Sequence, residues 1–399
     1  MFFCATLARK KTMDNFEQKA AYCTLGRIFG FEPSVGMRLV EAAGSAEAIF
    51  SMGDKALDSL LGPYCKFRHM LTSDEFRKSE DELQGLAAKG CRFISAAEEG
   101  YPPLLLECPD APLGLYVKSV SEPAEIFCSR PSVSVVGTRD MSMYGREWCR
   151  RIVEALAGCR RQPAIVSGLA IGVDITAHTA ALELGIPTIA VLPTYITEVY
   201  PARHRGWAAR IAETPGCALV SDYPPGVTPQ PVNFLRRNRI IAGFSQATVL
   251  VESRDKGGGL ITANLAFEYS RDVYALPGRA DDIRSQGCNR LIRAKVAEPI
   301  DDIDAFASSV GLGTFTRRNK LILKEEIERV YSSRTDRQEI DFIYEVARMI
   351  KDNRGVSIDE ICAVRGCSWA EATKATGMLQ ADGFIEVDLF QRCGMKYRF

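Results

Sequence analysis

Histidine is scarce in this chain, which has only His69, His178 and His204 among its 399 residues. The 13 cysteines are scattered, and no two of them have the C-x-x-C spacing of a zinc site. The nearest pair, Cys362 and Cys367, is separated by four residues. With so few nitrogen ligands and no paired thiolates, we expect no metal site and mostly buried, reduced thiols, as in a cytoplasmic protein.

Long apolar runs are missing too. No segment approaches the 18 consecutive apolar residues of a membrane helix, so we expect no membrane partner. The first residues, MFFCATLARKK, lack a signal-peptide cleavage pattern, and Met13 is an alternative start to Met1. The net charge is +0, since Lys+Arg and Asp+Glu are 50 each. A basic surface must therefore be local, and Lys and Arg do outnumber Asp and Glu between Pro231 and Lys295.

The length suggests two or three domains. Residues 14–75 contain short helical patterns separated by Gly or Pro, which predict a small helical domain of the SAM or helix-hairpin-helix kind. The candidate hairpin turn is Gly30-Phe31-Glu32. Because the carboxylate of Glu32 opposes a DNA phosphate, a packing role is favoured over a DNA contact.

Residues 76–305 are predicted to form one α/β domain. After an amphipathic helix and strands near Ile94 and Leu115–Val117, apolar runs alternate with helical patterns. The expected strands are 132–137, 164–168, 188–193, 217–221, 247–253 and 272–276, and the expected helices are 144–158, 172–184, 203–213, 234–243, 259–270 and 285–294. Unbroken Val/Ile/Ala/Leu strands predict a parallel, doubly wound α/β sheet that is buried on both faces.

Three loops leave the carboxyl ends of these strands, where such sheets bind ligands. They contain Gly137-Thr138-Arg139, Ser167-Gly168 and Lys256-Gly257-Gly258-Gly259. We expect them to converge on one crevice with a cluster formed by Asn233, Phe234, Arg236, Arg237, Asn238 and Arg239. Guanidinium groups, a ring for stacking and glycine-rich backbone are what binding of a phosphodiester strand requires. The helical spacing means that the three arginines cannot all face one way, so at least one should pair with an internal acid.

Motifs of nucleotide enzymes are absent from these loops. The turn at Gly137 lacks G-x-G-x-x-G, and the glycine triplet lacks the Lys-Ser/Thr of a P-loop, so neither a dinucleotide cofactor nor ATP hydrolysis is expected. His178 follows Asp174 by four residues, but a structural histidine is favoured over a catalytic pair. No G-x-S-x-G nucleophile motif occurs.

Residues 306–337 are predicted to be a charged linker, and residues 338–399 a winged helix. Ser357 and Glu360 have the spacing of a capping box. The candidate recognition helix, Ser368 to Gln380, has Lys374 as its only cation, so a protein-contact or packing role is favoured over duplex readout.

The blocks VVGTRDMSMYG, IVSGLAIGVDITAHTAAL, VYPARH, NFLRRNRIIAGFS, GGGLITANLAFE and GCNRLI occur in order. In this the chain resembles the DprA/Smf family of DNA-processing proteins, strongly over about 90–300. The resemblance implies an extended Rossmann-like fold. It also implies a homodimer that binds single-stranded DNA, protects incoming DNA and loads RecA recombinase during natural transformation. It also implies that the crevice residues named above contact the DNA. The chain departs from the family pattern at Ile171, where an arginine is usual, and at His204, where asparagine is frequent.

A binding protein without enzymatic activity is therefore the favoured hypothesis. The alternative is a nucleotide-processing enzyme that resembles phosphoribohydrolases, whose glycine loop contains an essential glutamate. Here the loop reads KGGGLITANLAFE, and Glu268 lies more than two helical turns beyond the glycines. A nucleotide-sensing regulator is a third possibility.

Overall fold

The computed structural model describes residues 16–62, 64–313, 323–353, 355–388 and 391–395. The chain forms two compact units, Met1–Thr316 and Arg317–Phe399. Both candidate start residues, Met1 and Met13, lie outside the described residues, as do parts of the expected linker and of the expected wing. No helix in the described part of the chain has the length and apolar character that crossing a bilayer would require.

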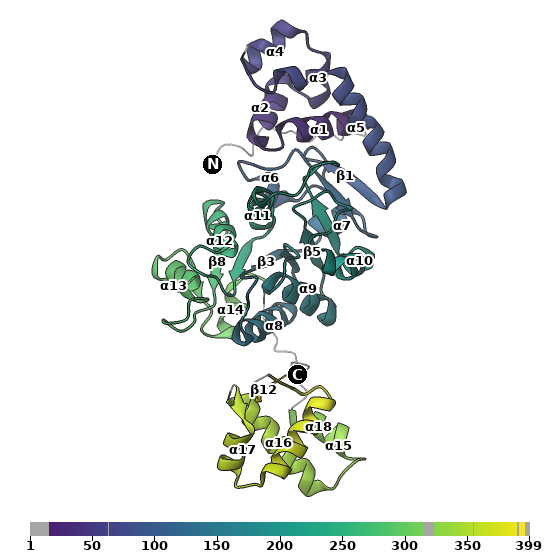
Figure 1. Ribbon diagram of the computed structural model, residues 1–399. Coiled ribbons are helices and arrows are strands. Elements are labelled where there is room, and N and C mark those ends of the chain that lie inside the picture. Colours follow the sequence, from purple (N-terminus) through teal and green to yellow (C-terminus); the bar gives the residue numbers. More distant parts are fainter. Residues whose placement is uncertain (1–15, 63, 314–322, 354, 389–390, 396–399) are drawn as a thin grey trace. The chain divides into compact units, whose positions relative to one another are not determined.

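A nine-stranded sheet lies at the centre of the described part of the first unit (Figure 1). Its strands are β1 (Cys91–Ser95), β2 (Gly114–Lys118), β3 (Ser132–Val136), β4 (Ala164–Ser167), β5 (Thr188–Val191), β6 (Ala218–Ser221), β7 (Ala247–Leu250), β8 (Asp272–Ala275) and β9 (Glu298–Pro299), in the order β1-β2-β6-β5-β4-β3-β7-β8-β9. Strands β3 to β9 pair in parallel, and β1 and β2 add an antiparallel edge. The six strands predicted between residues 132 and 276 all form, with ends within three residues of the expected ones.

The chain winds outward from β3 to β6 in one direction and from β7 to β9 in the other. The topology therefore switches between β3 and β7, which is where open parallel sheets bind ligands. The connecting helices are α8 (Met143–Ala157), α9 (Val173–Leu184), α10 (Arg205–Glu213), α11 (Pro231–Phe244), α12 (Gly258–Glu268) and α13 (Gln286–Arg293), and short helices α6 (Pro103–Leu106), α7 (Pro123–Cys128) and α14 (Ile303–Ser309) flank them.

Alternation along the strands produces two apolar cores, one on each face of the sheet. Val133 and Val135 of β3 point into a core shared with α8, α9 and α14. Val136 points into the other core, which includes residues of α10, α11, α12 and α13. Burial on both faces explains why the strands are apolar throughout.

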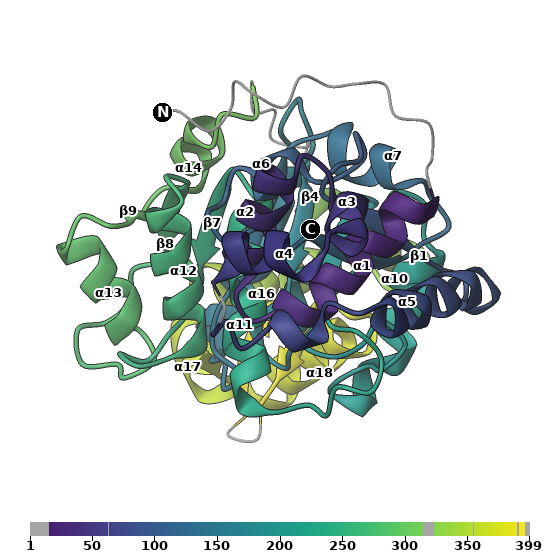
Figure 2. The same ribbon diagram turned by 90° about the horizontal axis from the view of Figure 1, so that it is seen from above.

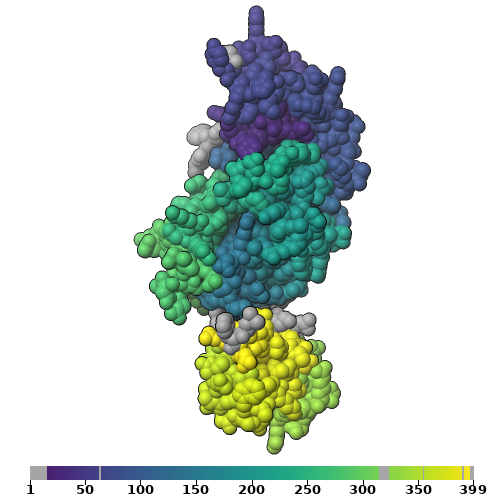
Figure 3. All heavy atoms as spheres, in the orientation of Figure 1, coloured from purple at the N-terminus to yellow at the C-terminus, as the bar shows by residue number. Residues whose placement is uncertain are grey.

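The N-terminal helices share one of these cores. They are α1 (Phe16–Phe29), α2 (Pro33–Ala43), α3 (Ala46–Ser51), α4 (Asp54–Leu61) and α5 (Ser73–Leu86). Leu25 of α1 belongs to the same apolar cluster as Leu115 of β2, and the space-filling view shows the purple and blue helices packed directly on the teal sheet region (Figure 3). The domain boundary expected at residue 75 falls inside α5, which packs against α1.

The second unit contains α15 (Leu323–Tyr331), α16 (Arg337–Asp352), α17 (Ile358–Arg365), α18 (Trp369–Ala381) and a sheet of β10 (Val356–Ser357), β12 (Arg392–Met395) and β11 (Ile385–Val387) in that order. The capping box of Ser357 and Glu360 forms as predicted. Within the range expected to be a linker, α14 and α15 are helical. Leu323, Ile327 and Tyr331 of α15 are buried in the core of this unit, because their spacing of four residues places them on one side of the helix.

Candidate nucleic-acid interface

The loops that follow β3, β4 and β7 meet at the switch in topology. The backbone N–H of Thr138 donates to the carbonyl of Glu252 at 2.8 Å, and the N–H of Val173 donates to the carbonyl of Thr138 at 3.2 Å. Gly172 precedes α9 with a φ of +84°, and a Cβ at this position would lie 2.3 Å from the oxygen of Thr138. Only glycine allows both this conformation and this close approach.

A cavity of about 360 Å³ opens beside these loops. Its lining consists of Arg139, Gly168, Ala170, Ile171, Tyr200, Pro201, Arg203 and Phe234. Three of the residues predicted from the sequence, Arg139, Gly168 and Phe234, are thus brought to one hollow by the loop after β3, the loop after β4 and the first turn of α11.

Aromatic rings and cations lie next to each other in this cavity. The rings of Tyr200 and Phe234 meet edge to face, with centroids 5.0 Å apart. The guanidinium carbon of Arg139 lies 5.2 Å from the centroid of Phe234. Arg139 and Arg203 are exposed, and Tyr200 is 47% exposed. Exposed guanidinium groups can bind phosphates, and a partly exposed ring can stack on bases. Proteins that bind single-stranded nucleic acid combine these two contacts.

Arg237 lies beneath the cavity, directly under Gly168, and does not line it. This side chain is buried, and its Nη1 donates to the carbonyl of Gly168 at 2.7 Å and to the carbonyl of Val191. Ser167 is buried as well, and its hydroxyl donates to the carbonyl of Val135 at 2.6 Å. Burial lowers the pKa of Arg237 to about 10, against the attraction of Asp174, so the guanidinium stays protonated at neutral pH.

Asp174 and His178 are buried near Arg237. The carboxylate of Asp174 accepts hydrogen bonds from the N–H groups of Gly168 at 3.1 Å and Ala170 at 3.3 Å. Burial raises the pKa of Asp174, and the charge of Arg237 opposes this rise. His178 contacts the hydroxyl of Thr188 through Nδ1 at 2.7 Å, and burial lowers its pKa to about 3. A neutral, buried imidazole bonded to Thr188 fits the structural role favoured from the sequence.

The remaining arginines of α11 lie on another side of the helix. Arg239 is buried and forms an ion pair with Asp222 at 2.5 Å, which confirms that an arginine of this cluster pairs with an internal acid. It also donates to the carbonyl of Asp110. Arg236 lies 3.7 Å from the same carboxylate oxygen of Asp222, so two arginines share one acid.

The other predicted site residues flank the cavity without lining it. Buried Asn233 donates to the carbonyl of Pro193 at 3.4 Å, and buried Asn238 donates to the carbonyl of Gly258 at 3.4 Å, which ties α11 to the start of α12. Lys256 and Gly258 are exposed. No side chain caps the amino end of α12, so its backbone N–H groups and helix dipole favour an anion there.

Sequence reasoning missed the contribution of the loop between β5 and α10. Tyr200, Pro201 and Arg203 belong to the block VYPARH, where a ring and a cation lie close together in the segment between β5 and α10. That pattern was the available signal. Ile171 also lines the cavity, so the position at which a family arginine is missing faces the same hollow as Arg203.

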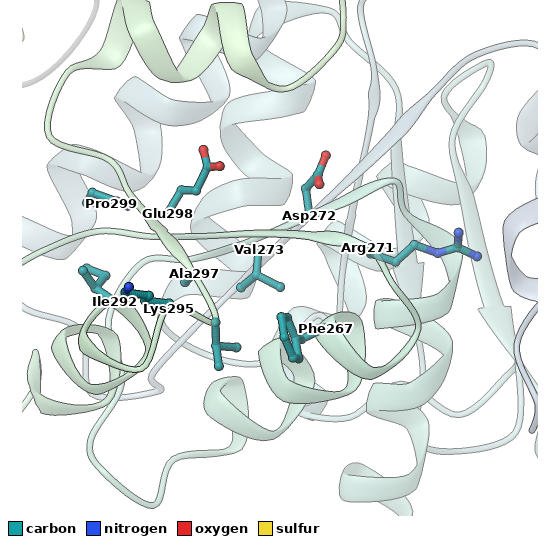
Figure 4. Close-up of a pocket in the computed structure, with 10 residues that line it drawn as sticks. Phe267, Arg271, Asp272, Val273, Ile292, Lys295, Ala297, Glu298 and Pro299 are labelled. Atoms are coloured by element: carbon teal, nitrogen blue, oxygen red, sulfur yellow. The ribbon is translucent and has the colours of Figure 1, made fainter.

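A second cavity, of about 400 Å³, lies where β8 begins, beside Asp272 and Val273 (Figure 4). In Figure 4, Phe267 and Val273 lie on one side of the strand, and the carboxylates of Asp272 and Glu298 lie on the other. None of the predicted site residues lines it.

Comparison with known proteins identifies the chain. A family model described as DNA recombination-mediator protein A matches residues 92–311, which is more than half of the chain. The chain belongs to this family. The family membership confirms the resemblance inferred from the ordered sequence blocks, and the match covers the whole crevice described above.

Individual relatives agree with this assignment. Protein Smf of Escherichia coli K12 is 41% identical over 218 residues, which are 54% of this chain and 56% of that protein. DNA processing protein DprA of Streptococcus pneumoniae is 37% identical over 200 residues, which are 50% of this chain and 68% of that protein. An X-ray structure of DprA from Streptococcus pneumoniae superposes with a TM-score of 0.62 and 27% identity, covering 75% of this chain and 98% of that one. The mixed α/β fold with a large, mostly parallel sheet is thus shared.

The chain matches 56–57% of the length of the Smf proteins from Escherichia coli and Synechocystis. The alignments therefore concern the sheet region above all.

Proposed function

We propose that this chain binds single-stranded DNA in the cavity at the switch in topology. The observation that carries the proposal is the juxtaposition of exposed Arg139 and Arg203 with the Tyr200–Phe234 ring pair in one hollow. Two cations can bind consecutive phosphates while the rings stack on bases, and stacking of this kind tolerates any sequence.

The other predicted residues divide into two roles. Lys256 and Gly258, at the exposed start of α12, extend the phosphate track beyond the cavity. Ser167 and Arg237 are buried beneath the lining, and Asn233 and Asn238 hold α11 against neighbouring segments. Gly137 and Thr138 join the loops through the contact with Glu252. Arg203 supplies a cation to the hollow in which Ile171 replaces the usual arginine.

The biological role that we propose follows from the family. The chain acts in the cytoplasm as a recombination mediator, protects incoming DNA and helps to load RecA recombinase during natural transformation, and it works as a homodimer. The described N-terminal helices form a SAM-like domain that packs on the sheet region, and the second unit serves as a winged helix that contacts protein rather than DNA.

An enzymatic role is disfavoured by the position of the one glutamate in the glycine-loop block. Glu268 ends α12 and Gly258 begins it, so about 15 Å separates them at the helical rise per residue. Glu252, which does lie near the crevice, is buried and accepts hydrogen bonds from the backbone N–H of Ser142 at 2.9 Å and from its hydroxyl. Release of free base from AMP or from a cytokinin-type monophosphate would nevertheless establish the enzyme.

Titration with oligo-dT at several salt concentrations tests the proposal. Arg139→Ala and Arg203→Ala should each weaken binding by about tenfold or more, since a hydrogen bond to a charged group contributes roughly 1.5–3 kcal/mol. Each should also reduce the salt slope by about 0.7, the value for one phosphate contact with a single strand.

Arg210→Ala is the matched control. This exposed arginine lies in the last turn of α10, which leads into β6 and therefore lies toward the end of the sheet opposite the cavity. Unchanged affinity in both cavity variants, or equal losses in all three, would contradict the assignment. Tight binding of a mononucleotide without binding of oligo-dT would point to a nucleotide sensor instead.

A further inference from the structure

Phe31 is a large apolar side chain that is exposed at a turn. It follows α1 and precedes α2, and 61% of its surface is accessible to solvent. The turn itself is fixed, because the N–H of Glu32 donates to the carbonyl of Phe29 at 2.7 Å. The ring is thus held on a fixed turn with an accessible surface.

The ring of Phe31 contacts an arginine of α11. The guanidinium carbon of Arg236 lies 4.2 Å from the centroid of Phe31 and 5.7 Å from the centroid of Tyr223. Figure 1 shows α11 on the side of the sheet region that faces α1 and α2, and the view from above shows α11 close to these helices (Figure 2). The N-terminal helices and the arginine cluster therefore meet at this pair.

The charge around this pair is positive on balance. Asp222 is engaged by Arg239 at 2.5 Å and lies 3.7 Å from Arg236, so one carboxylate serves two guanidinium groups. Within the described residues, Nη2 of Arg236 is buried and has no hydrogen-bond partner. The carboxylate of Glu32, which would oppose a phosphate, forms an ion pair with Lys66.

The start of α11 connects this pair to the cavity. Phe234 and Arg236 are two residues apart, about 200° around the helix, so they lie on opposite flanks of it. Between these flanks the helix presents Val232 and Leu235, which are 46% and 47% exposed. A nucleic-acid strand that leaves the cavity past Phe234 can cross this apolar surface and reach Phe31.

We propose that Phe31 is a second base-stacking residue, which binds single-stranded DNA that extends beyond the cavity, with Arg236 holding the ring from beneath. This inference rests on the proposed function, because it takes the strand in the cavity as its starting point. A ring whose one face is occupied by a cation offers its other surface to a base, and the positive charge beneath the ring favours a polyanion nearby. The N-terminal helices thereby lengthen the binding site.

The test compares a short oligo-dT of about three nucleotides, kept short so that it stays at the cavity, with a long one of about twenty. Phe31→Leu keeps an apolar side chain at the turn but removes the ring. It should weaken binding of the long oligo roughly 5- to 150-fold, the loss expected for one stacked base, and leave the short oligo unchanged. Phe31→Trp should restore long-oligo affinity, and the fluorescence of the introduced indole should be quenched by the long oligo but not by the short one.

Tyr64→Leu is the control, because Tyr64 is 98% exposed in the same group of helices and should leave both affinities unchanged. Wild-type affinity of Phe31→Leu for the long oligo would overturn the inference, and so would equal losses for both oligos. If Arg139→Ala weakens the short oligo while Phe31→Leu leaves the long one unaffected, only the role of Phe31 falls. If the wild-type chain binds neither oligo, the proposed function falls together with it.

Discussion

At the scale of single residues, burial gives the crevice arginines different tasks although their chemistry is the same. Arg139 is exposed beside Phe234, whereas Arg237 and Arg239 are buried and donate to carbonyls of distant segments. A buried guanidinium whose hydrogen bonds are made within the protein holds backbone segments in place. Only the exposed arginine can exchange hydration water for a phosphate at small cost.

The sequence could predict that these arginines gather but not which of them reach solvent. Arg239 is buried against two partners that are distant in the sequence. Asp222 is 17 residues away in the chain, and the carbonyl of Asp110 is 129 residues away. The position of Arg203 in the cavity could not be predicted from α11 either, because Arg203 belongs to the segment between β5 and α10. Periodicity within α11 carries no information about these neighbours.

His178 gives a prediction for the pH dependence of stability. Its pKa is about 3 in the folded chain and ordinarily about 6.5 in an unfolded one, mainly because burial disfavours the charged form, and Arg237 and His204 act in the same direction. Between these values the unfolded state binds a proton that the folded state does not. Stability from this group is therefore full above pH 6.5 and is lost as pH falls toward 3, at up to about 1.4 kcal/mol per pH unit.

His178→Asn keeps an amide near the position of Nδ1 and removes the titration. In urea unfolding between pH 7 and pH 5, the variant should lose less stability than the wild type, by up to about 2 kcal/mol. The raised pKa of Asp174 is present in both proteins, so it cancels in the comparison. Parallel pH profiles for the two proteins would show that the imidazole titrates normally.

At the scale of elements, the glycine triplet before and within α12 is not one uniform phosphate nest. A Cβ on Gly257 would lie 2.3 Å from the hydroxyl of Ser253, and one on Gly259 would lie 2.9 Å from Cα of Gly137. A Cβ on Gly258 would meet nothing within 4 Å. The outer two glycines therefore allow close packing of α12 on the neighbouring loops, and the central one faces open space.

Matched alanine substitutions separate these roles. Gly259→Ala pushes α12 away from the loop after β3 and should destabilise the fold by roughly 1–3 kcal/mol, the usual cost of overpacking. Gly258→Ala should change stability by about 1 kcal/mol or less, in the stabilising direction, because alanine is the better helix former. Chemical denaturation measures both, and an equal loss in the two variants would contradict the packing account.

Element positions in the sheet region were largely predictable because each buried strand is apolar and each helix is periodic. Two departures from expectation, one in this region and one in the second unit, have a clear physical reason. α11 begins at Pro231, three residues before the expected start, since proline fits the first turn of a helix and lacks only an N–H that needs no partner there. α15 lies within a highly charged stretch, and its apolar side becomes apparent only once Leu323, Ile327 and Tyr331 are seen packed against α16 and its neighbours.

At the scale of the whole molecule, the two units differ in what they offer to a polyanion. The first contains the cavity with its exposed cations. In the second, α18, which occupies the position of a recognition helix, has Lys374 as its only cation, and this lysine forms an ion pair with Glu339. The same helix exposes Trp369 (56%), a residue type typical of protein contacts.

Removal of residues 317–399 should therefore leave oligo-dT affinity within about threefold of the full chain, and the salt slope unchanged, because no phosphate contact is lost. Arg139→Ala in the shortened chain should weaken binding as it does in the full chain, which links the retained affinity to the cavity. Because apolar cluster residues of the second unit are all drawn from residues 323–395, the first unit keeps its own core when the second is removed. A loss of tenfold or more on truncation, with a smaller salt slope, would instead place phosphate contacts on the second unit and assign it a direct role in binding DNA.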